Sequence, residues 1–557
     1  MSLEKQVSPP MIHVTHEVFN QPPPLINYNT FLQDATLVES LRRESAGWAE
    51  EQLTALGAIT GSEEALQWAT DANTYTPVLH THDRYGHRID EVTFHPSWHQ
   101  LMRTSLEAAA HALSWREPTI GAHVARAAAF YLCSQMEGGH CCPVSMTHAV
   151  VPVLRAHSDV AGWETLLTST IYDPGLRIPQ HKKGILCGMG MTEKQGGSDV
   201  RTNTTRAIPL SDDEKTYVLT GHKWFCSAPM CDLFLVLAQA PHGLTCFLVP
   251  RVLPDGTRNR FFIQRLKDKL GNRSNASSEV EFEQTWAMRV GEEGRGVRTI
   301  IEMVNFTRLD CVIGSAATMR QAVMQAIHHA RYRKVFGCLL VDQPLMQNVL
   351  ADLAIESEAA TLLAMRLARA CDRARLEMHE AFIKRIGTAV GKYWVTKRCP
   401  TQVAEALECL GGNGYVEESL MPRLYREAPL NSIWEGSGNV NCLDVLRAMA
   451  KEPASIETFL AEVSLARGRD VRLDRAIQQL QDEFLDLTNL EVRARRIVER
   501  MALVWQGALL VQYGHPAVAE GFCASRLQGD WGHAFGTLPA DTNFMAIIER
   551  VMPTIEA

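Results

Sequence analysis

The chain has 557 residues, which at about 100–200 residues per domain predicts several domains. Hydrophobic residues make up 46% and charged residues 21%, as in ordinary globular proteins, and the formal net charge of −8 excludes a uniformly basic nucleic-acid-binding protein. No apolar run approaches the roughly 20 residues that span a bilayer, and the first residues lack the apolar segment of a secretory signal. These features predict a soluble, cytoplasmic protein with no membrane partner, whose 14 cysteines are mostly buried thiols.

The spacing of apolar residues changes twice along the chain. In about the first 180 residues they recur every three or four positions, as in 121–139, which predicts helices. Between about 215 and 283, short β-branched and aromatic runs alternate with turn residues, the pattern of an antiparallel sandwich or barrel. After Gly296 the helical pattern returns and predicts a helix bundle. The predicted helices of this bundle lie near 315–335, 345–372, 379–399 and 401–410.

The sequence therefore predicts an α+β multidomain fold. Its predicted domains are an N-terminal helical domain (1–184), a middle antiparallel β domain (185–290), a helix-bundle domain (291–450) and an additional helical domain (451–557). The additional domain contains one lysine and ten arginines against fifteen acidic residues. On a helix, Arg493, Arg496 and Arg500 share one face, which predicts either a phosphate-binding surface or a solvated face with Glu–Arg pairs.

The segment GMTEKQGGSD, residues 190–199, combines paired glycines with hydroxyl side chains just before the β region. Such a loop lets backbone N–H groups approach a ligand closely. It is not a dinucleotide-binding fingerprint, because Gly188 and Gly190 lack a third glycine at the required spacing. A plain surface turn is the alternative.

Three further segments place glycines, aromatic rings or a carboxylate near the ends of predicted elements. In GHKWFCS (221–227), Trp224 and Phe225 either wall a planar ring system or fill a core. ECLGGNGY (408–415) predicts a sharp turn, which a helix C-cap also explains. In IWEGSGN (433–439), apolar and glycine neighbours predict a partly desolvated Glu435 whose pKa is raised towards that of a working base; an exposed turn glutamate is the alternative.

Together these four motifs resemble the signatures of the acyl-CoA dehydrogenase flavoproteins, in the family's order and from about residue 185 to 445. Further segments narrow the resemblance to the alkylation-response branch of that family, the AidB-type proteins. These segments are THEVFNQPPPL, FHPSWH, CPVSMTHA, GMGMTEKQGGSDVRTNTTRA and NSIWEGSGNVNCLDVLR. The resemblance implies the family's fold and FAD as cofactor, with an extra helical segment after 450 that is associated with double-stranded DNA binding in that branch.

The resemblance also implies roles for individual residues. Glu435 would be the base that removes the α proton of an acyl thioester while the β hydride passes to the flavin. The residues implied in cofactor binding are Met191, Thr192, Gly197 and Ser198 at the flavin ring and ribityl chain, Phe225, Cys226 and Ser227 on the opposite wall, and Ile433, Trp434, Ser437 and Asn439 in the fourth loop. Arg333 matches the arginine that reaches the flavin pyrophosphate of a neighbouring subunit, which implies a homo-oligomer, either a dimer or a dimer of dimers; a helix end facing water is the alternative.

The chain departs from the family pattern at three places. Trp434 replaces the tyrosine before the base, and Ser437 replaces a threonine. Around 305–308 the arginine is present, but the aspartate that helps to bind the coenzyme A tail has no clear counterpart. These departures predict only residual turnover of acyl-CoA.

The leading hypothesis is an FAD-containing, acyl-CoA dehydrogenase-like oxidoreductase of the DNA alkylation response that binds double-stranded DNA non-specifically and limits alkylation damage. The arginines predicted to contact phosphates are Arg447, Arg469, Arg472, Arg475, Arg493, Arg496 and Arg500. The alternative is a metabolic acyl-CoA dehydrogenase for branched or long-chain acyl-CoA, whose last helices serve assembly only. Two weaker hypotheses place iron at His157 and Asp159, or zinc at His140, Cys141, Cys142 and His148; the leading hypothesis includes no metal.

Overall fold

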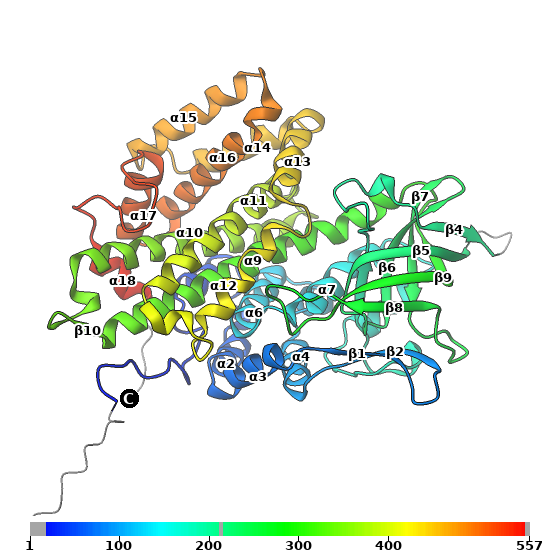
Figure 1. Cartoon of the computed structure of the whole chain (residues 1–557). Coiled ribbons are helices and arrows are strands. Elements are labelled where there is room, and N and C mark those ends of the chain that lie inside the picture. The colour runs from blue at the N-terminus through cyan, green and yellow to red at the C-terminus, as the bar shows by residue number, and fades with distance from the viewer. Residues whose placement is uncertain (1–17, 211–214, 552–557) are drawn as a thin grey trace, which may run out of the picture.

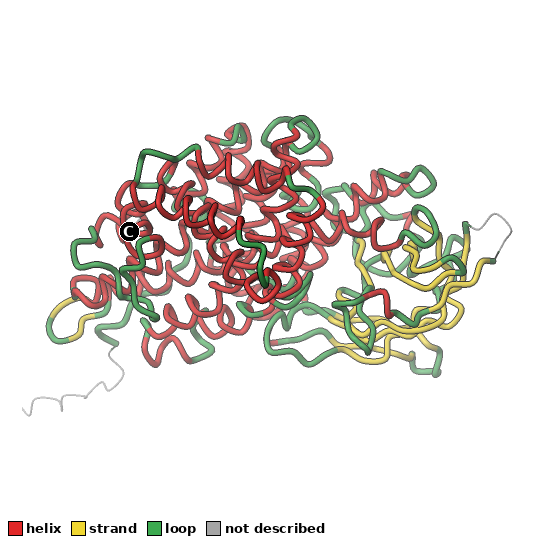
Figure 2. Tube along the Cα trace, turned by 90° about the horizontal axis from the view of Figure 1, so that it is seen from above, coloured by secondary structure: helices red, strands yellow, loops and turns green. Residues whose placement is uncertain are grey.

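The computed structural model describes residues 18–210 and 215–551. The β domain lies at one end of the molecule, and long helices run from it towards the opposite end, with the N-terminal helices along one side (Figure 1). Figure 2 shows from above that the large sheet is confined to one end. Part of the segment THEVFNQPPPL lies outside the described residues. The first ten residues of the chain lie wholly outside them. Within the described ranges, no helix is both long enough and apolar enough to cross a membrane.

The N-terminal region consists mainly of helices, as the apolar spacing predicts. They are α1 (Ala35–Arg43), α2 (Glu50–Thr60), α3 (Glu63–Thr74), α4 (Pro96–Glu107), α5 (Leu113–Arg116), α6 (Ala122–Met136), α7 (Cys141–Arg155) and α8 (Glu164–Leu167). Asp34 begins α1 as its N-cap, because its side chain accepts a hydrogen bond from the backbone of Leu37 at 3.0 Å. Helices α6 and α7 are buried along nearly their whole length, so they form the centre of this region.

A β hairpin that the sequence analysis did not predict interrupts these helices. Its strands are β1 (Val78–His82) and β2 (Arg88–Thr93). Arg88 donates from Nη2 to the carbonyl of Ile263 at 3.1 Å, and Arg251 donates from Nη2 to the carbonyl of Asp90 at 3.0 Å. Since an isolated two-stranded hairpin is marginally stable in water, these contacts with the β domain explain why it forms here.

Residues 187–290 form a seven-stranded sheet. Its strands are β3 (Cys187–Gly190), β4 (Arg206–Pro209), β5 (Thr216–Ser227), β6 (Leu233–Ala240), β7 (Gly243–Pro250), β8 (Phe261–Leu266) and β9 (Ser277–Val290). They pair in the order β3-β6-β4-β5-β9-β7, with β8 on β9, and β6 also pairs with β7. Most pairs are antiparallel as predicted, but β3 and β4 run parallel to β6. In β5 the register shifts between Lys223 and Cys226, so that Trp224 and Phe225 leave the regular ladder.

The region after the sheet is a bundle of long helices. They are α9 (Gly296–Tyr332), α10 (Pro344–Arg373), α11 (Met378–Glu408), α12 (Met421–Glu427) and α13 (Gly438–Lys451), with a small hairpin of β10 (Lys334–Val335) and β11 (Cys338–Leu339). The predicted segments 379–399 and 401–410 are one helix, because Pro400 lies inside α11 without ending it. Proline in a helix interior costs about 3 kcal/mol. Its neighbours Cys399 and Val403 are almost fully buried, and packing of this kind offsets that cost.

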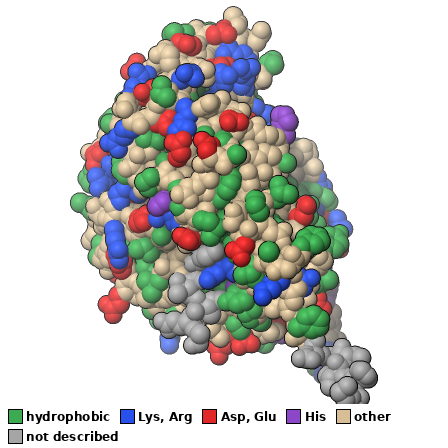
Figure 3. Space-filling view, turned by 90° about the vertical axis from the view of Figure 1, so that its left-hand side faces the viewer, with side chains coloured by type: hydrophobic (Ala, Val, Ile, Leu, Met, Phe, Trp, Pro, Cys, Tyr) green, Lys and Arg blue, Asp and Glu red, His purple; other side chains and the backbone are tan. Residues whose placement is uncertain are grey.

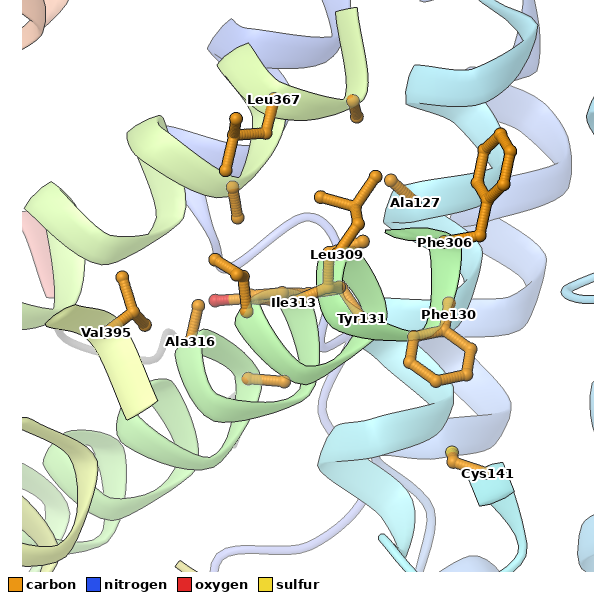
Figure 4. Packing of buried hydrophobic residues seen from close by; sticks show 14 of the residues in the cluster. Ala127, Phe130, Tyr131, Cys141, Phe306, Leu309, Ile313, Ala316, Leu367 and Val395 are labelled. Carbon is orange, nitrogen blue, oxygen red and sulfur yellow. The ribbon is translucent and has the colours of Figure 1, made fainter. Parts of the chain in front are cut away.

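The core lies where the N-terminal helices meet the bundle (Figure 4). The labelled side chains come from α6 (Ala127, Phe130, Tyr131), α7 (Cys141), α9 (Phe306, Leu309, Ile313, Ala316), α10 (Leu367) and α11 (Val395). The single polar atom of Tyr131 is satisfied, because its hydroxyl donates to Asp34 Oδ2 at 3.0 Å. The core is therefore continuous from the N-terminal helices into the bundle.

The chain after residue 450 is helical, as predicted. Its helices are α14 (Ala454–Ser464), α15 (Val471–Leu485), α16 (Leu490–Tyr513), α17 (Pro516–Phe522) and α18 (Phe544–Val551). Trp505 of α16 is fully buried, and a Cβ on Gly387 of α11 would lie 2.5 Å from its ring, so α16 packs closely on the bundle. Trp394 of α11 also donates from Nε1 to Gln506 Oε1 at 3.0 Å. The boundary at 450 remains a sequence prediction, and these helices pack directly on the bundle (Figure 1).

Two buried ionic networks join the last helices to the bundle. Arg526, which follows α17, forms ion pairs with Asp352 and, at 3.1 Å, with Glu356 of α10, and Glu356 also pairs with Arg398 of α11 at 3.0 Å. All four side chains are buried or nearly so. Removing one partner of such a network leaves uncompensated charge in a medium of low dielectric constant.

Further along the bundle, Arg366 of α10 contacts Glu380 of α11 at 2.7 Å and Glu462 of α14 at 2.6 Å. Both carboxylates are nearly inaccessible to solvent, as is the Arg366 guanidinium. Helix α14 is thus attached to α10 and α11 by charge-assisted hydrogen bonds as well as by apolar contacts.

We expect Arg526→Met to destabilise the protein by about 3–5 kcal/mol, because Asp352 and Glu356 then lose a buried cation. Denaturant unfolding followed by circular dichroism measures the change. The control is Arg475→Ala, an exposed position whose substitution should change stability by no more than about 0.5 kcal/mol. Equal stability of the two variants would show that the network does not stabilise the docking of the C-terminal helices.

Candidate active site

The loop between α12 and α13 carries the predicted base. Glu435 has φ +57°, a left-handed conformation that is uncommon for residues other than glycine. The hydroxyl of Thr307 on α9 lies 2.6 Å from Glu435 Oε2 and 3.0 Å from the carbonyl of Val304. Since the carboxylate is partly buried and contacts a single hydroxyl, it remains available for proton transfer.

Two cations contact the backbone on both sides of the base. Lys392 of α11 donates from Nζ to the carbonyls of Trp434 and Gly436, both at 2.8 Å. Arg308 of α9 donates from Nε to the carbonyl of Glu435 at 2.9 Å and pairs with Asp444 at 3.0 Å. Three consecutive carbonyls of the loop are therefore held by side chains of two different helices.

The electrostatic surroundings raise the pKa of the Glu435 carboxyl above its ordinary value. Burial is the main cause, because it disfavours the charged form. The hydrogen bond from Thr307, followed by the charges of Lys392 and Arg308, opposes this rise by favouring the carboxylate. This direction agrees with the sequence-based expectation of a raised pKa for Glu435. The two cations that lower this pKa, Lys392 and Arg308, come from distant parts of the chain.

In the glycine-rich segment 190–199, buried contacts hold the side chain of Glu193, and the residues after it are exposed. Glu193 is fully buried and pairs with the equally buried Lys223 of β5 at 2.7 Å. It also accepts hydrogen bonds from the backbone of Thr204 and Thr205 at 2.7 and 3.2 Å. The following residues, 194–199, are exposed. Glu193 thus anchors an open loop at the edge of the sheet.

Gly197 in this loop lies against Thr192. A Cβ at Gly197 would stand 2.4 Å from Thr192 Oγ1, so any side chain there would displace the hydroxyl. Thr192 in turn accepts a backbone hydrogen bond from Trp224 at 2.9 Å, which joins the loop to the β5 bulge. Met191 and Ser198 occupy the same loop, partly buried and exposed respectively, so these predicted residues lie together.

The β5 bulge presents an aromatic surface. Phe225 is 52% exposed, although it is a large apolar side chain inside a strand. Lys267 Nζ lies 3.3 Å from the centroid of the Trp224 ring and 4.7 Å from that of Phe225, which is cation–π geometry. Cys226, also predicted to bind the cofactor, is fully buried, so its thiol faces the core of the domain and is not available to a ligand.

Cys142 of α7 connects the bulge with the base loop. Burial raises the pKa of its thiol to about 12; the charge of Lys269 and a hydrogen bond with Ser227 lower it, and the charge of Glu435 raises it further. Cys142 thus interacts with the bulge through Ser227 and is near enough to the base loop for the charge of Glu435 to act on its thiol.

The remaining predicted cofactor residues divide into two groups. Ile433 is exposed and Trp434 and Ser437 are partly buried, all within the base loop, and Asn439 is exposed in the first turn of α13. Arg333 lies elsewhere: it ends α9 beside the β10–β11 hairpin, at the end of the bundle far from the β domain (Figure 1). It donates to the carbonyl of Asn20 at 2.7 Å. A single chain does not bring Arg333 to the site.

The two metal hypotheses are wrong for the described part of the chain, where no group of three or more His, Cys, Asp or Glu side chains is placed to hold a metal. Both ring nitrogens of His140 already have partners, Glu137 at 3.0 Å and Ser105 at 2.8 Å. Asp159 is exposed and pairs with Lys215 at 3.7 Å. The residues are near in sequence, but each belongs to a separate polar contact.

The predicted DNA-contacting arginines are also divided by the structure. Arg493 and Arg500 of α16 both pair with Glu483 of α15, the former at 2.6 Å, and Arg472 pairs with Asp470 and Glu520, both at 2.6 Å. These three arginines are therefore paired with carboxylates, but the pairs of Arg493 and Arg500 with Glu483 link α16 to α15 and are not the pairs within one helix that the alternative predicted.

Arg447 is mostly exposed but lies 3.4 Å from Asp444. Arg469, Arg475 and Arg496 are exposed, and none of them forms an ion pair with another described residue. On the face shown in Figure 3, basic and acidic side chains alternate near the top, over the last helices. If a polyanion binds to this surface, its contacts must come mainly from Arg469, Arg475 and Arg496, because the other predicted arginines lie beside carboxylates.

The sequence reasoning missed the contacts of Thr307, Lys392, Lys269 and Cys142, the last of which it considered only as a zinc ligand. Lys392 carried a usable signal, because it is the only charged residue within the run IGTAVGKYWVT (386–396) of a predicted helix. A lone lysine in such a run predicts a buried cation that needs a partner. The other three carried no comparable signal, since their roles depend on which helices and loops become neighbours.

Comparison with known proteins assigns the family. Residues 20–174 match the family model described as the adaptive response protein AidB N-terminal domain, 188–285 match the acyl-CoA dehydrogenase middle domain and 294–450 match the acyl-CoA dehydrogenase C-terminal domain. The AidB protein of Escherichia coli (strain K12) is 48% identical over 513 residues, 91% of this chain and 94% of that protein. Acyl-CoA dehydrogenase family member 11 of Caenorhabditis elegans is 30% identical over 89% of this chain and 85% of its own length.

Solved structures agree in fold. Caenorhabditis elegans ACDH-11 in complex with C11-CoA superposes with a TM-score of 0.85 at 27% identity, over 92% of this chain and 94% of that one. An acyl-CoA dehydrogenase of Bacillus anthracis complexed with FAD has a TM-score of 0.63 at 19% identity, over 78% and 81% of the two chains. The chain belongs to the acyl-CoA dehydrogenase family. It is accordingly an FAD-dependent oxidoreductase, and the predicted fold class is confirmed.

The residues at the site fit FAD. The exposed backbone of 194–199, kept open by Gly197, allows close approach of a ligand, and the exposed ring of Phe225 offers a flat apolar wall. Among the described residues, none accepts a hydrogen bond from the backbone N–H of Glu435. An open loop, an exposed aromatic ring and an unpaired donor suit a large planar cofactor with a substrate beside it.

We expect Thr307→Val to raise the pKa of Glu435 further, because the carboxylate loses the hydrogen bond that favours its charged form. Base catalysis requires the carboxylate, so the rising limb of the rate against pH should move to higher pH. Stopped-flow reduction of the bound flavin by acyl-CoA as a function of pH measures this shift. Thr318→Val is the control, since Thr318 lies on the same helix and its hydroxyl donates to the carbonyl of Gly314. An unchanged profile in Thr307→Val would contradict the role of Thr307.

Proposed function

We propose that this flavoprotein acts in the response to DNA alkylation: it binds double-stranded DNA without sequence preference and limits alkylation damage, with residual acyl-CoA dehydrogenase activity. The observation that carries the proposal is the 48% identity with Escherichia coli AidB over 91% of the chain, together with the match of residues 20–174 to the adaptive response protein AidB N-terminal domain. Since the identity extends over 91% of the chain, it covers more than the three segments that match the family models, and both parts of the proposal rest on it.

In the dehydrogenase reaction, Glu435 is proposed to take the α proton of an acyl thioester. The electron pair of the broken Cα–H bond then forms the Cα=Cβ double bond. FAD, when bound, supplies the two-electron acceptor for the hydrogen that leaves Cβ. The loop 190–199 and the ring of Phe225 would hold the flavin from two sides, with Ser437 and Asn439 contacting it from the base loop. The unpaired N–H of Glu435 would donate to the thioester oxygen as enolate charge develops there.

The charges at the site support a weak activity towards coenzyme A esters. Arg308 is occupied on both sides, by the carbonyl of Glu435 and by Asp444. Asp444 also pairs with Arg385 at 3.1 Å and with Arg447 at 3.4 Å, so it neutralises several neighbouring arginines at once. Arginines that already share a carboxylate in this way are poorly placed to bind the phosphates of a coenzyme A tail.

The DNA-binding surface is proposed to centre on the exposed arginines Arg469, Arg475 and Arg496, with Arg447 at its edge. Binding would be electrostatic and independent of base sequence, since guanidinium groups contact phosphates. Arg472, Arg493 and Arg500 would contribute less, because a local carboxylate competes with phosphate for each of them.

We further propose a cytoplasmic homo-oligomer, a dimer of dimers. The support is Phe336, which is 96% exposed at the tip of the β10–β11 hairpin, next to Arg333. A fully exposed aromatic ring beside an arginine is suited to an interface with a second chain. Arg333 would then reach the cofactor of a neighbouring subunit, which a single chain does not allow.

A metabolic acyl-CoA dehydrogenase for branched or long-chain acyl-CoA is the second candidate. The observation in its favour is that ACDH-11, with a TM-score of 0.85 to this chain, was solved in complex with C11-CoA. Rapid, complete reduction of the flavin by such a thioester, without DNA binding at low salt, would favour this candidate.

The first test of the flavin site is Glu435→Gln. We expect the variant to retain FAD and to lose reduction by C11-CoA by at least about 100-fold, because the amide cannot accept the α proton. Anaerobic stopped-flow absorbance of the flavin measures the rate, and the flavin spectrum reports the bound cofactor. A variant that is still reduced at the wild-type rate would remove Glu435 from the mechanism.

The DNA proposal is tested by a triple substitution of Arg469, Arg475 and Arg496 to alanine. Each phosphate contact contributes about 0.9 to the slope of log K against log salt, so loss of all three should reduce the slope by about 2–3. Fluorescence anisotropy of a labelled random duplex at several salt concentrations gives the slope. The matched control replaces the exposed Arg84, Arg206 and Arg298, which removes the same charge from other regions. Equal slopes for both triple variants would place DNA binding elsewhere or exclude it.

A further inference from the structure

The base loop is held by a buried lysine that has no carboxylate partner. Of the lysines that the structure describes, Lys182, Lys223 and Lys392 are buried. Lys182 pairs with Asp232 and Lys223 with Glu193, both at 2.7 Å. Lys392 is fully buried, yet within the described chain its ammonium donates to two main-chain carbonyls, those of Trp434 and Gly436, and to no carboxylate.

Such an arrangement is unfavourable for folding alone. Burial lowers the pKa of Lys392, because the charged form loses its hydration, while nearby Cys311 and Glu435 raise it. Neutral carbonyls compensate a buried charge less completely than a carboxylate does. A side chain that merely filled this space would therefore be apolar. The position of Lys392 instead points to a task at the loop that it contacts.

The contact with Trp434 fixes the direction of the next amide. The described peptide bonds are all trans, and in a trans peptide the C=O and N–H groups point to opposite sides. Because Lys392 holds the carbonyl of Trp434, the N–H of Glu435 points away from α11. Among the described residues this N–H has no acceptor, which leaves it free for a ligand.

The second contact of Lys392 preserves the same orientation. Glu435 has φ +57°, and such strained conformations persist only where the surroundings impose them. Lys392 holds the carbonyl after this residue as well as the one before it, Arg308 holds the carbonyl of Glu435 itself, and Asn441 donates to the carbonyl of Gly436 at 2.7 Å. The loop thus cannot rotate the amide without breaking hydrogen bonds to buried cations.

We propose that Lys392 is a positioning residue of the flavin site: by holding the carbonyls on either side of Glu435, it aims the Glu435 N–H at the carbonyl oxygen of a bound acyl thioester and strengthens it as a donor. A cation hydrogen-bonded to an amide oxygen polarises the amide, which makes the N–H more positive. The donor is set before the substrate binds, so it requires no reorganisation as negative charge develops on the oxygen. This inference rests on the proposed dehydrogenase chemistry of the site.

The test compares Lys392→Met and Lys392→Gln with the wild-type holoenzyme. C11-CoA labelled with ¹³C at the thioester carbonyl is bound, and its C=O stretch is recorded by isotope-edited infrared spectroscopy. We expect the wild type to lower this frequency relative to free C11-CoA, and Lys392→Met to lose most of the shift. Flavin reduction should slow by about 100-fold in kcat with little change in KM, the size seen when one oxyanion donor is removed. Lys392→Gln, which keeps N–H donors but no charge, should recover part of the shift.

Two further variants separate this role from others. Glu435→Gln keeps the loop and its N–H, so it should retain the infrared shift although flavin reduction is lost. Lys451→Met removes an exposed cation at the end of α13 and should leave both readouts unchanged. Flavin content and the unfolding midpoint of each variant are measured in parallel, and Lys392→Gln serves if Lys392→Met does not fold.

A full infrared shift in folded, flavin-bound Lys392→Met or Lys392→Gln would overturn the role of Lys392 and leave the proposed dehydrogenase chemistry intact. If wild-type protein neither binds C11-CoA nor is reduced by any acyl-CoA in a straight-chain and branched series, the proposed chemistry itself fails. The two failures are therefore distinguishable.

Discussion

The convergence of two buried cations on one short loop is the constraint on which the site depends. Arg308 comes from α9 and Lys392 from α11, and both contact consecutive carbonyls around Glu435. The loop has its conformation only while these two helices keep their relative position. Since helix packing in a close-packed core does not slide without forming voids, the bundle transmits its rigidity to the base.

The last helices contribute to the same constraint. Helix α11, which carries Lys392, is covered by α16 through Trp505, and α14 is attached to α10 and α11 through Arg366, Glu380 and Glu462. The segment after 450 is therefore part of the support of the flavin site as well as the place of the proposed DNA contacts. The proposed DNA contacts on α15 and α16 therefore lie on helices that belong to the same packed unit as the bundle.

Charge pairing limits what the arginine-rich segment does. The chain carries a net charge of −8, so attraction to a polyanion has to be local. Glu483 of α15 binds both Arg493 and Arg500 of α16, which joins the two helices and at the same time neutralises two candidate phosphate ligands. The arginines without an ion pair among the described residues, Arg469, Arg475 and Arg496, are exposed to solvent. Stability of the segment and its affinity for a polyanion thus compete for the same side chains.

Much of the protein follows from local sequence. The change from helical to β spacing and back, the glycine-rich loop before the sheet and the partly buried carboxylate of Glu435 are readable because each depends on residues a few positions apart. The hairpin 78–93, the continuity of α11 through Pro400, the buried thiol of Cys226 and the hydrogen bonds of Lys392 and Thr307 were decided only by tertiary structure. Each of these depends on a partner more than about forty residues away or on burial by another element, and periodicity along the chain carries no information about which distant group will be the neighbour.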